Sequence, residues 1–216
     1  MLEVFIPAFV TLFVVIDPPG IVPMFAALTS HDTMEQRRKT ATKAVIIATI
    51  ILTIFALTGE SFLNALGVSI DAFRAAGGIL LFILALEMIF EKRTKRREKR
   101  TDQLLADEEE HEAHGEESDD ISVFPLGIPM IAGPASIATM MLQMSANQDD
   151  MLAQATVMGA LLVNMLLAWI ILVVATKFLH KINDSFMKAL TRILGIILAA
   201  MAMQLIVDGV MGVVLA

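Results

Sequence analysis

The stretch VVIDPPGIVPMF (residues 14–25) interrupts an apolar run with an aspartate, three prolines and a glycine. Each proline fixes φ and removes a backbone donor, so this run is too broken for an ordinary helix. Aspartate is a preferred cap of a helix N-terminus, and proline is favoured at the first helical position. We therefore expect one helix to end near residue 16 and another, capped by Asp17, to begin at Pro18.

The chain around this stretch has the composition of a membrane protein. Hydrophobic residues make up 56% of its 216 residues, and the mean hydropathy is +0.73. An apolar run of about 20 residues can span a bilayer as a helix, whereas barrel strands need only about 10. The predicted fold is all-α, a polytopic membrane protein with six transmembrane helices near residues 4–28, 44–66, 72–90, 122–145, 152–176 and 192–215.

Charged residues are concentrated between the third and fourth spans. Residues 92–120 contain a basic block followed by an acidic one, which is typical of a solvated linker, and we expect this linker to be disordered. His111 and His114 lie among the acids, and weak metal binding there is the less favoured alternative.

The lysines and arginines of the connections predict the orientation. If all six segments cross, the basic residues of the linker and of the first and last long connections share one side, which we assign to the cytoplasm. The protein is then expected in the cell inner (cytoplasmic) membrane, with both termini periplasmic. A re-entrant fourth segment would move the basic residues of the last connection outside, so crossing is favoured.

Two short matches relate the halves of the chain. DPPGIVPM (17–24) resembles GPASIATM (133–140) at an offset of 116, and FRAAGGILL (73–81) resembles TRILGIILA (191–199) at an offset of 118. Because each half has three spans, residues 121–216 would repeat residues 1–91 upside down. Inverted repeats whose helices are interrupted at corresponding positions indicate a secondary transporter. The alternative is two proline-kinked helices that merely pack better.

The first and fourth helices are thus expected to break near the membrane midplane. At the second break Gly133 takes the cap position, and it has no side chain for the exposed N–H groups of the next turn. Free N–H groups at a helix N-terminus favour an anion such as a carboxylate. Asp17 could receive an ammonium group, a proton or Na⁺, or could simply be a cap. The expected substrate-binding residues are Asp17, Pro18, Gly20, Gly133, Pro134, Ala135, Ser136 and Thr139.

Four further polar residues are candidates for a gate or a solute path. Arg74 and Arg192 are related by the repeat, although pairing of Arg74 with Asp71 is the favoured interpretation. Asn164 lies within the fifth span and Asp208 within the sixth, where each could line a path or bond between helices.

Four stretches together resemble the MarC family of integral membrane proteins: VIDPPGIVPMF, DAFRAAGGILLFILALEMIF, PLGIPMIAGPASIATMML and LTRILGIILAAMAMQLIVDGV. The resemblance implies six membrane helices and the transport of small neutral amino acids. The chain differs from the family pattern in having DPPG where aspartate, proline, an aliphatic residue and glycine are usual.

Three classes of function follow from these patterns. The first is an ion-coupled secondary transporter or exporter of small neutral amino acids or similar zwitterions, with H⁺ or Na⁺ as the coupling ion, because no nucleotide-binding loop is present. The second is a passive channel or a broad-specificity drug exporter. An intramembrane enzyme is disfavoured, since all four histidines lie in connections. The expected partners are the solute and the lipid bilayer, without nucleic acid, metal or organic cofactor; a homo-oligomer is left open.

Overall fold

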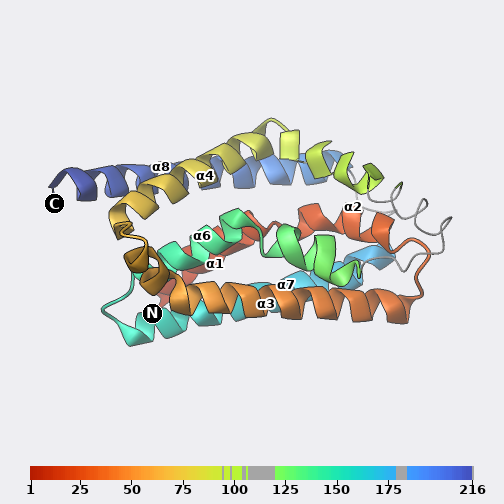
Figure 1. Ribbon diagram of the computed structural model, residues 1–216. Helices are drawn as coiled ribbons and strands as arrows, with labels where there is room; N and C mark the ends of the chain where they lie inside the picture. Colours follow the sequence, from red (N-terminus) through yellow and green to blue (C-terminus); the bar gives the residue numbers. More distant parts are fainter. Residues whose placement is uncertain (94, 98, 104–105, 107–119, 179–183, 216) are drawn as a thin grey trace.

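The computed structural model describes residues 1–93, 95–97, 99–103, 106, 120–178 and 184–215, and confirms the all-α fold (Figure 1). The helices, in chain order, are α1 (Leu2–Ile16), α2 (Pro18–Leu28), α3 (Met34–Ala65), α4 (Ile70–Ile89), η1 (Ser122–Ile131), α6 (Pro134–Ser145), α7 (Met151–Phe178) and α8 (Asp184–Leu215).

The helices lie roughly side by side along one direction (Figure 1). The pair α1–α2 packs on α7, and the pair η1–α6 packs on α3. A core of large side chains fills the space between them, including Leu12, Phe25, Leu52, Met140 and Leu161. The broken helices are therefore held in the middle of the bundle, between two long unbroken ones.

Helices α4 and α8 form a separate pair along one side of this bundle (Figure 1). They approach closely at Gly78, where an added Cβ would lie 2.9 Å from the backbone nitrogen of Ile206 and 3.0 Å from the carbonyl oxygen of Ala202. Small residues allow this contact between helices in a membrane, where close packing replaces the hydrophobic effect. A second apolar cluster, including Val15, Leu81 and Leu198, joins the pair to α1.

The described part of the chain contains five helical stretches long and apolar enough to cross a membrane, or six if η1 and α6 form one span bent by 53°. In Figure 1 this bent pair runs from one end of the molecule to the other, and both chain termini lie at the same end. Large apolar side chains are exposed along the long helices, among them Ile50, Ile83, Leu166 and Ile196. This pattern is that of a polytopic membrane protein whose outer surface faces lipid.

Element η1 differs from the regular half-helix that a simple break would give. Its backbone leaves helical geometry at Phe124 (φ −127°, ψ 126°) and at Ile128 (φ −130°, ψ 127°), each of which precedes a proline. A residue before proline is pushed towards extended geometry because the proline ring crowds its backbone. The prolines of the fourth segment thus distort the whole of η1, and a regular helix begins only at Pro134.

The start of the charged linker also differs from the expected disorder. The basic segment, residues 92–100, is helical at its described positions 92, 93, 95–97, 99 and 100. The acidic part of the linker, with His111 and His114, lies outside the described residues.

Candidate functional site

The first break in the bundle is formed by Asp17. This residue has left-handed backbone geometry (φ 54°, ψ 61°), and its N–H closes α1 by donating to the carbonyl of Phe13 at 2.9 Å. Its Oδ1 accepts a hydrogen bond from the Gly20 N–H at 3.3 Å, so it caps α2 as the sequence predicts. Aspartate is one of the few residues other than glycine that visits this geometry routinely.

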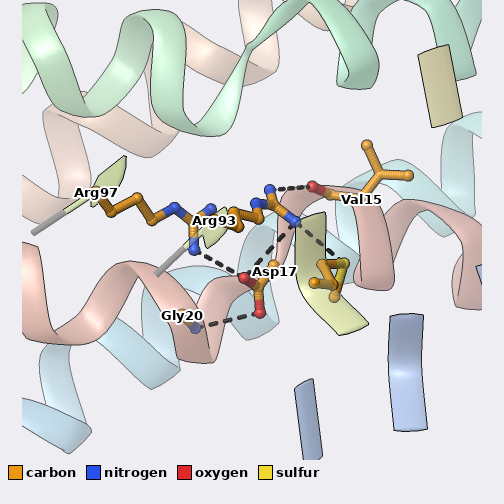
Figure 2. Close-up of polar contacts among 6 residues, drawn as sticks. Val15, Asp17, Gly20, Arg93 and Arg97 are labelled. Atoms are coloured by element: carbon orange, nitrogen blue, oxygen red, sulfur yellow. Dashed lines mark hydrogen bonds and ion pairs between the residues drawn. The ribbon is translucent and has the colours of Figure 1, made fainter. Parts of the chain in front are cut away.

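The carboxylate of Asp17 is also paired with two arginines from the basic segment (Figure 2). Arg97 Nη1 lies 2.7 Å from Asp17 Oδ2, and Arg93 Nη1 lies 3.7 Å from the same oxygen. Asp17 is only 2% exposed, and a buried carboxylate is tolerated when a cation compensates it. The basic segment is therefore part of the site, not a solvated linker.

Arg93 serves the backbone of the break as well. Its Nη2 donates to the carbonyl oxygen of Val15 at 2.8 Å, in the last turn of α1 (Figure 2). Pro18 and Pro19 cannot donate to the carbonyls of that turn, and the C-terminal end of a helix attracts cations. Burial, and after it the charge of Arg97, lower the pKa of the Arg93 guanidinium to about 9 although the charge of Asp17 opposes them, so Arg93 stays protonated at neutral pH.

Gly20 has no side chain, and this leaves space for the ion pair between Asp17 and Arg97. A Cβ at residue 20 would lie 2.1 Å from Asp17 Oδ2 and 2.4 Å from Arg97 Nη1. The glycine of the DPPG run is thus explained by the space that an ion pair needs, in addition to its place in the first turn of α2.

The second break lies between η1 and α6. Gly133 is the N-cap of α6, no side chain caps this helix, and Pro134 is its first residue, as the sequence predicts. The N–H groups of Ala135 and Ser136 find no acceptor among the described residues. Ser136 is only 3% exposed, and its hydroxyl likewise has no partner in the described part of the chain. Three donors are therefore free at one helix end.

The two breaks meet at one cavity of about 340 Å³. Val15 and Met24 line it from the first break, Leu84 from α4, and the residues of the second break from the other side. The complete lining is Val15, Met24, Leu84, Arg93, Arg96, Arg97, Arg100, Pro129, Met130, Gly133, Pro134, Ala135 and Ser136. The four arginines, which we call the basic arc, make this cavity positively charged.

Some residues that the sequence suggested for the site have other surroundings. The Thr139 hydroxyl donates to the Ala135 carbonyl at 2.8 Å, within α6, and Thr139 does not line the cavity. Pro18 is buried beside Asp17 and does not line it either, and neither Asp17 nor Gly20 is among the lining residues.

The four gate or path candidates lie away from the cavity. Arg74 pairs with Asp71 at 2.9 Å, the interpretation that the sequence favours, and the exposed Arg192 pairs with Glu91 at 2.6 Å. Asn164 donates to the Phe9 carbonyl at 3.2 Å and so joins α7 to α1. Asp208 is exposed and accepts a hydrogen bond from Gln204 at 2.7 Å.

The sequence analysis did not identify the basic arc, because Arg93 and Arg97 pair with Asp17, which lies about 80 positions away in the chain. One signal pointed to it: a carboxylate predicted inside the membrane needs a cation, and residues 92–100 hold a dense group of them. The local sequence pattern does not predict that the side chains of residues 92–100 pack against the break at Asp17.

Comparisons with known proteins agree with the four motifs. The family model described as MarC family integral membrane protein matches residues 2–214. A UPF0056 membrane protein of Methanocaldococcus jannaschii is 36% identical over 98% of this chain and 89% of its own length. One of Pyrococcus abyssi is 33% identical, covering 98% and 96%.

The UPF0056 inner membrane protein YhgN of Escherichia coli is 31% identical, covering 95% of each chain. No solved structure matches. With helices of membrane-spanning length and a family match along almost its whole sequence, the chain belongs to the MarC family of integral membrane proteins.

Proposed function

We propose that this protein is a secondary transporter of small solutes that carry a carboxylate, and that it has no catalytic activity. The observation that carries the proposal is the meeting of two broken helices at one cavity. Irregular backbone at membrane depth is tolerated where it lines a cavity, and transporter sites are typically built from such breaks. Small neutral amino acids, or similar zwitterions, are the class implied by the family resemblance, and they are the first solutes to assay.

The carboxylate is proposed to bind at the start of α6. The N–H groups of Ala135 and Ser136 and the Ser136 hydroxyl are free donors beside the cavity, at the positive end of a 12-residue helix. Gly133, the N-cap residue, has no side chain that could accept hydrogen bonds from these N–H groups. A volume of about 340 Å³ is at the low end of small-molecule pockets, which favours a small solute.

The packing of the helices supports two inverted repeats. The broken pair of the first half packs on α7 of the second, and the broken pair of the second half packs on α3 of the first. Exchanging the halves interchanges these two contacts and leaves the contact between α4 and α8 unchanged. This is the pattern that a two-fold relation between residues 1–91 and 121–216 requires.

Transport is proposed to be coupled to H⁺ or Na⁺, with Asp17 as the coupling residue. A carboxylate at a helix break is suited to bind either ion, and here the ion would have to displace Arg93 and Arg97 from the Asp17 carboxylate. We further propose a location in the cytoplasmic membrane, with both termini outside and the basic segment at the cytoplasmic face.

Counterflow in proteoliposomes tests the function. Labelled glycine, alanine, aspartate and succinate are offered to the wild type under proton and sodium gradients. We expect saturable uptake of at least one of them, and its loss in Ala135→Leu, whose larger side chain would extend into the cavity that Ala135 lines. Absence of saturable uptake for all four solutes under both gradients would overturn the proposal, and flux that rises without saturation would indicate a passive channel.

A further inference from the structure

The first turns of α3 carry basic residues on an exposed face. Arg38, Lys39 and Lys43 are all exposed. Helix α3 has 32 residues and is therefore about 48 Å long, whereas the apolar core of a bilayer is about 30 Å thick. The N-terminal turns of α3 thus extend beyond the apolar core, to the level at which lipid phosphates lie.

Two hollows meet at Arg38, and each has both charged and apolar walls. The first, of about 520 Å³, lies along α3, and its lining includes Arg38, Lys39 and Ile46. The second, of about 530 Å³, lies between α3 and α7, and its lining includes Arg38, Trp169 and Ile170. Both isoleucines are exposed, so these apolar walls face lipid. Together the two hollows form a surface with a charged end and an apolar body, which we call the α3–α7 groove.

Arg38 is held in place where the hollows meet. Its guanidinium lies over the Trp169 ring, 5.7 Å from the ring centre. The Trp169 indole N–H donates to the Thr42 hydroxyl at 2.8 Å, and that hydroxyl donates to the Arg38 carbonyl at 2.7 Å. A guanidinium stacked on a ring keeps its N–H groups at the edge of its plane, from where they can bind a phosphate with two hydrogen bonds.

Positive charge is in excess on the walls of the groove. Arg38 has no carboxylate partner among the described residues, whereas Lys39 pairs with Glu35 at 2.8 Å and Lys43 pairs with Asp120. Asp120 does not line the groove, so three cations and one carboxylate do. Exposed pairs of this kind are weak, and an anion at Arg38 can compete with the carboxylates for the two lysines.

We propose that the α3–α7 groove binds an anionic phospholipid. Basic pockets beside membrane helices bind the headgroups of such lipids, and tryptophan is typical of the membrane interface. The lipid phosphate binds Arg38, with Lys39 and Lys43 beside it, and the acyl chains lie along the apolar walls. A phosphatidylcholine would bring its own positive charge to these residues, so the groove selects an anionic lipid. The groove shares no residue with the cavity between the breaks, and the inference does not depend on the transported solute.

Trp169 provides the measurement. It is the only tryptophan of a chain that has no tyrosine, so its fluorescence reports on the groove alone. Lipids with brominated acyl chains quench a tryptophan that they touch. The protein is reconstituted in vesicles of phosphatidylcholine and phosphatidylglycerol in which only one of the two lipids is brominated. We expect the quenching to show that phosphatidylglycerol binds at least about 5-fold more strongly, the effect of one basic residue on an anionic lipid.

Arg38→Gln should bring the binding of the two lipids to within about 2-fold of each other, and Arg38→Lys, which keeps the charge but not the planar fork, should lose less. Arg100→Gln is the matched control and should leave the preference unchanged. Arg100 also lies over an aromatic ring, 5.3 Å from the ring centre of Phe124, but it lines the cavity between the breaks. Lys39→Gln should also lower the preference, and it replaces Arg38→Gln if thermal unfolding shows that the latter is not folded.

Three outcomes would overturn the lipid site. The first is equal quenching of the wild type by the two brominated lipids. The second is a preference that survives Arg38→Gln, because it would then come from the basic residues of this membrane face as a whole. The third is loss of the preference when glycerol phosphate is added in solution, which would assign the groove to soluble phosphate compounds. None of them affects the transport proposal, which the counterflow of solutes tests.

Discussion

Gly20 is the residue on which the first break depends most directly. An alanine Cβ there would overlap Asp17 Oδ2 and Arg97 Nη1, at 2.1 and 2.4 Å. We expect Gly20→Ala to displace the ion pair and to lower the free energy of unfolding by about 1–3 kcal/mol, the usual cost of overpacking. Thermal unfolding in detergent measures it. Gly159→Ala in α7 is the control, because a Cβ there meets no atom within 4 Å, and it should be neutral or slightly stabilising.

The charge of Asp17 can be separated from its capping role. Asp17→Asn keeps an oxygen for the Gly20 N–H but leaves Arg93, only 7% exposed, without its carboxylate. Breaking one side of a buried ion pair costs about 3–5 kcal/mol, so we expect a large loss of stability in the same unfolding measurement.

Asp71→Asn is the control for Asp17→Asn. It removes the partly exposed ion pair with Arg74 and should lower the free energy of unfolding by less than about 1 kcal/mol. If Asp17→Asn and Asp71→Asn lowered the free energy of unfolding equally, the ion pairs of Asp17 would not be buried.

At the scale of elements, the sequence predicted the starts of α2 and α6 because both depend on local rules. A cap followed by proline appears as DP at residues 17 and 18 and as GP at 133 and 134. The prolines after Phe124 and Ile128 explain why these two residues of η1 are extended. The sequence analysis did not predict that these prolines distort the whole of η1. The packing of the basic segment on the break could not be predicted, since it depends on contacts between residues about 80 positions apart.

The start of η1 is tied to α3 by a pH-dependent contact. Asp120 accepts hydrogen bonds from Lys43 Nζ and from the Ser122 N–H and hydroxyl, and these bonds, that of Lys43 first, lower the pKa of the Asp120 carboxyl. A carboxyl whose folded pKa is lowered adds stability above its unfolded pKa of about 3.9, and this is lost as pH falls through the folded value.

Asp120→Asn should therefore lower stability at pH 7 by up to about 1 kcal/mol, a limit set by the exposure of the pair. Unfolding curves of the two proteins from pH 7 to pH 3 measure the effect, and the difference should shrink below about pH 4. A difference that stays constant over this range would mean that the charge of Asp120 does not contribute.

At the scale of the whole molecule, the arrangement of the spans decides how the cavity meets the two sides of the membrane. The turn after α2, near Ser30, and the turn after α6, near Gln148, lie at opposite ends of the bundle in Figure 1. They are separated by α3, by α4 and by the bent pair η1–α6, so they lie on opposite sides only if the bent pair crosses. The lysines and arginines that follow Ser30 predict that its turn lies in the cytoplasm.

The chain contains no cysteine, so single cysteines can report these two positions. Both Ser30 and Gln148 are exposed, and each can be replaced without disturbing the core. In intact cells we expect a membrane-impermeant maleimide to label Gln148→Cys, and to label Ser30→Cys only after the membrane is permeabilised. Labelling of both cysteines from one side would show that η1–α6 is a re-entrant loop. Labelling of Ser30→Cys in intact cells, and of Gln148→Cys only after permeabilisation, would place the basic arc at the outer face, where the cavity would first meet external solutes.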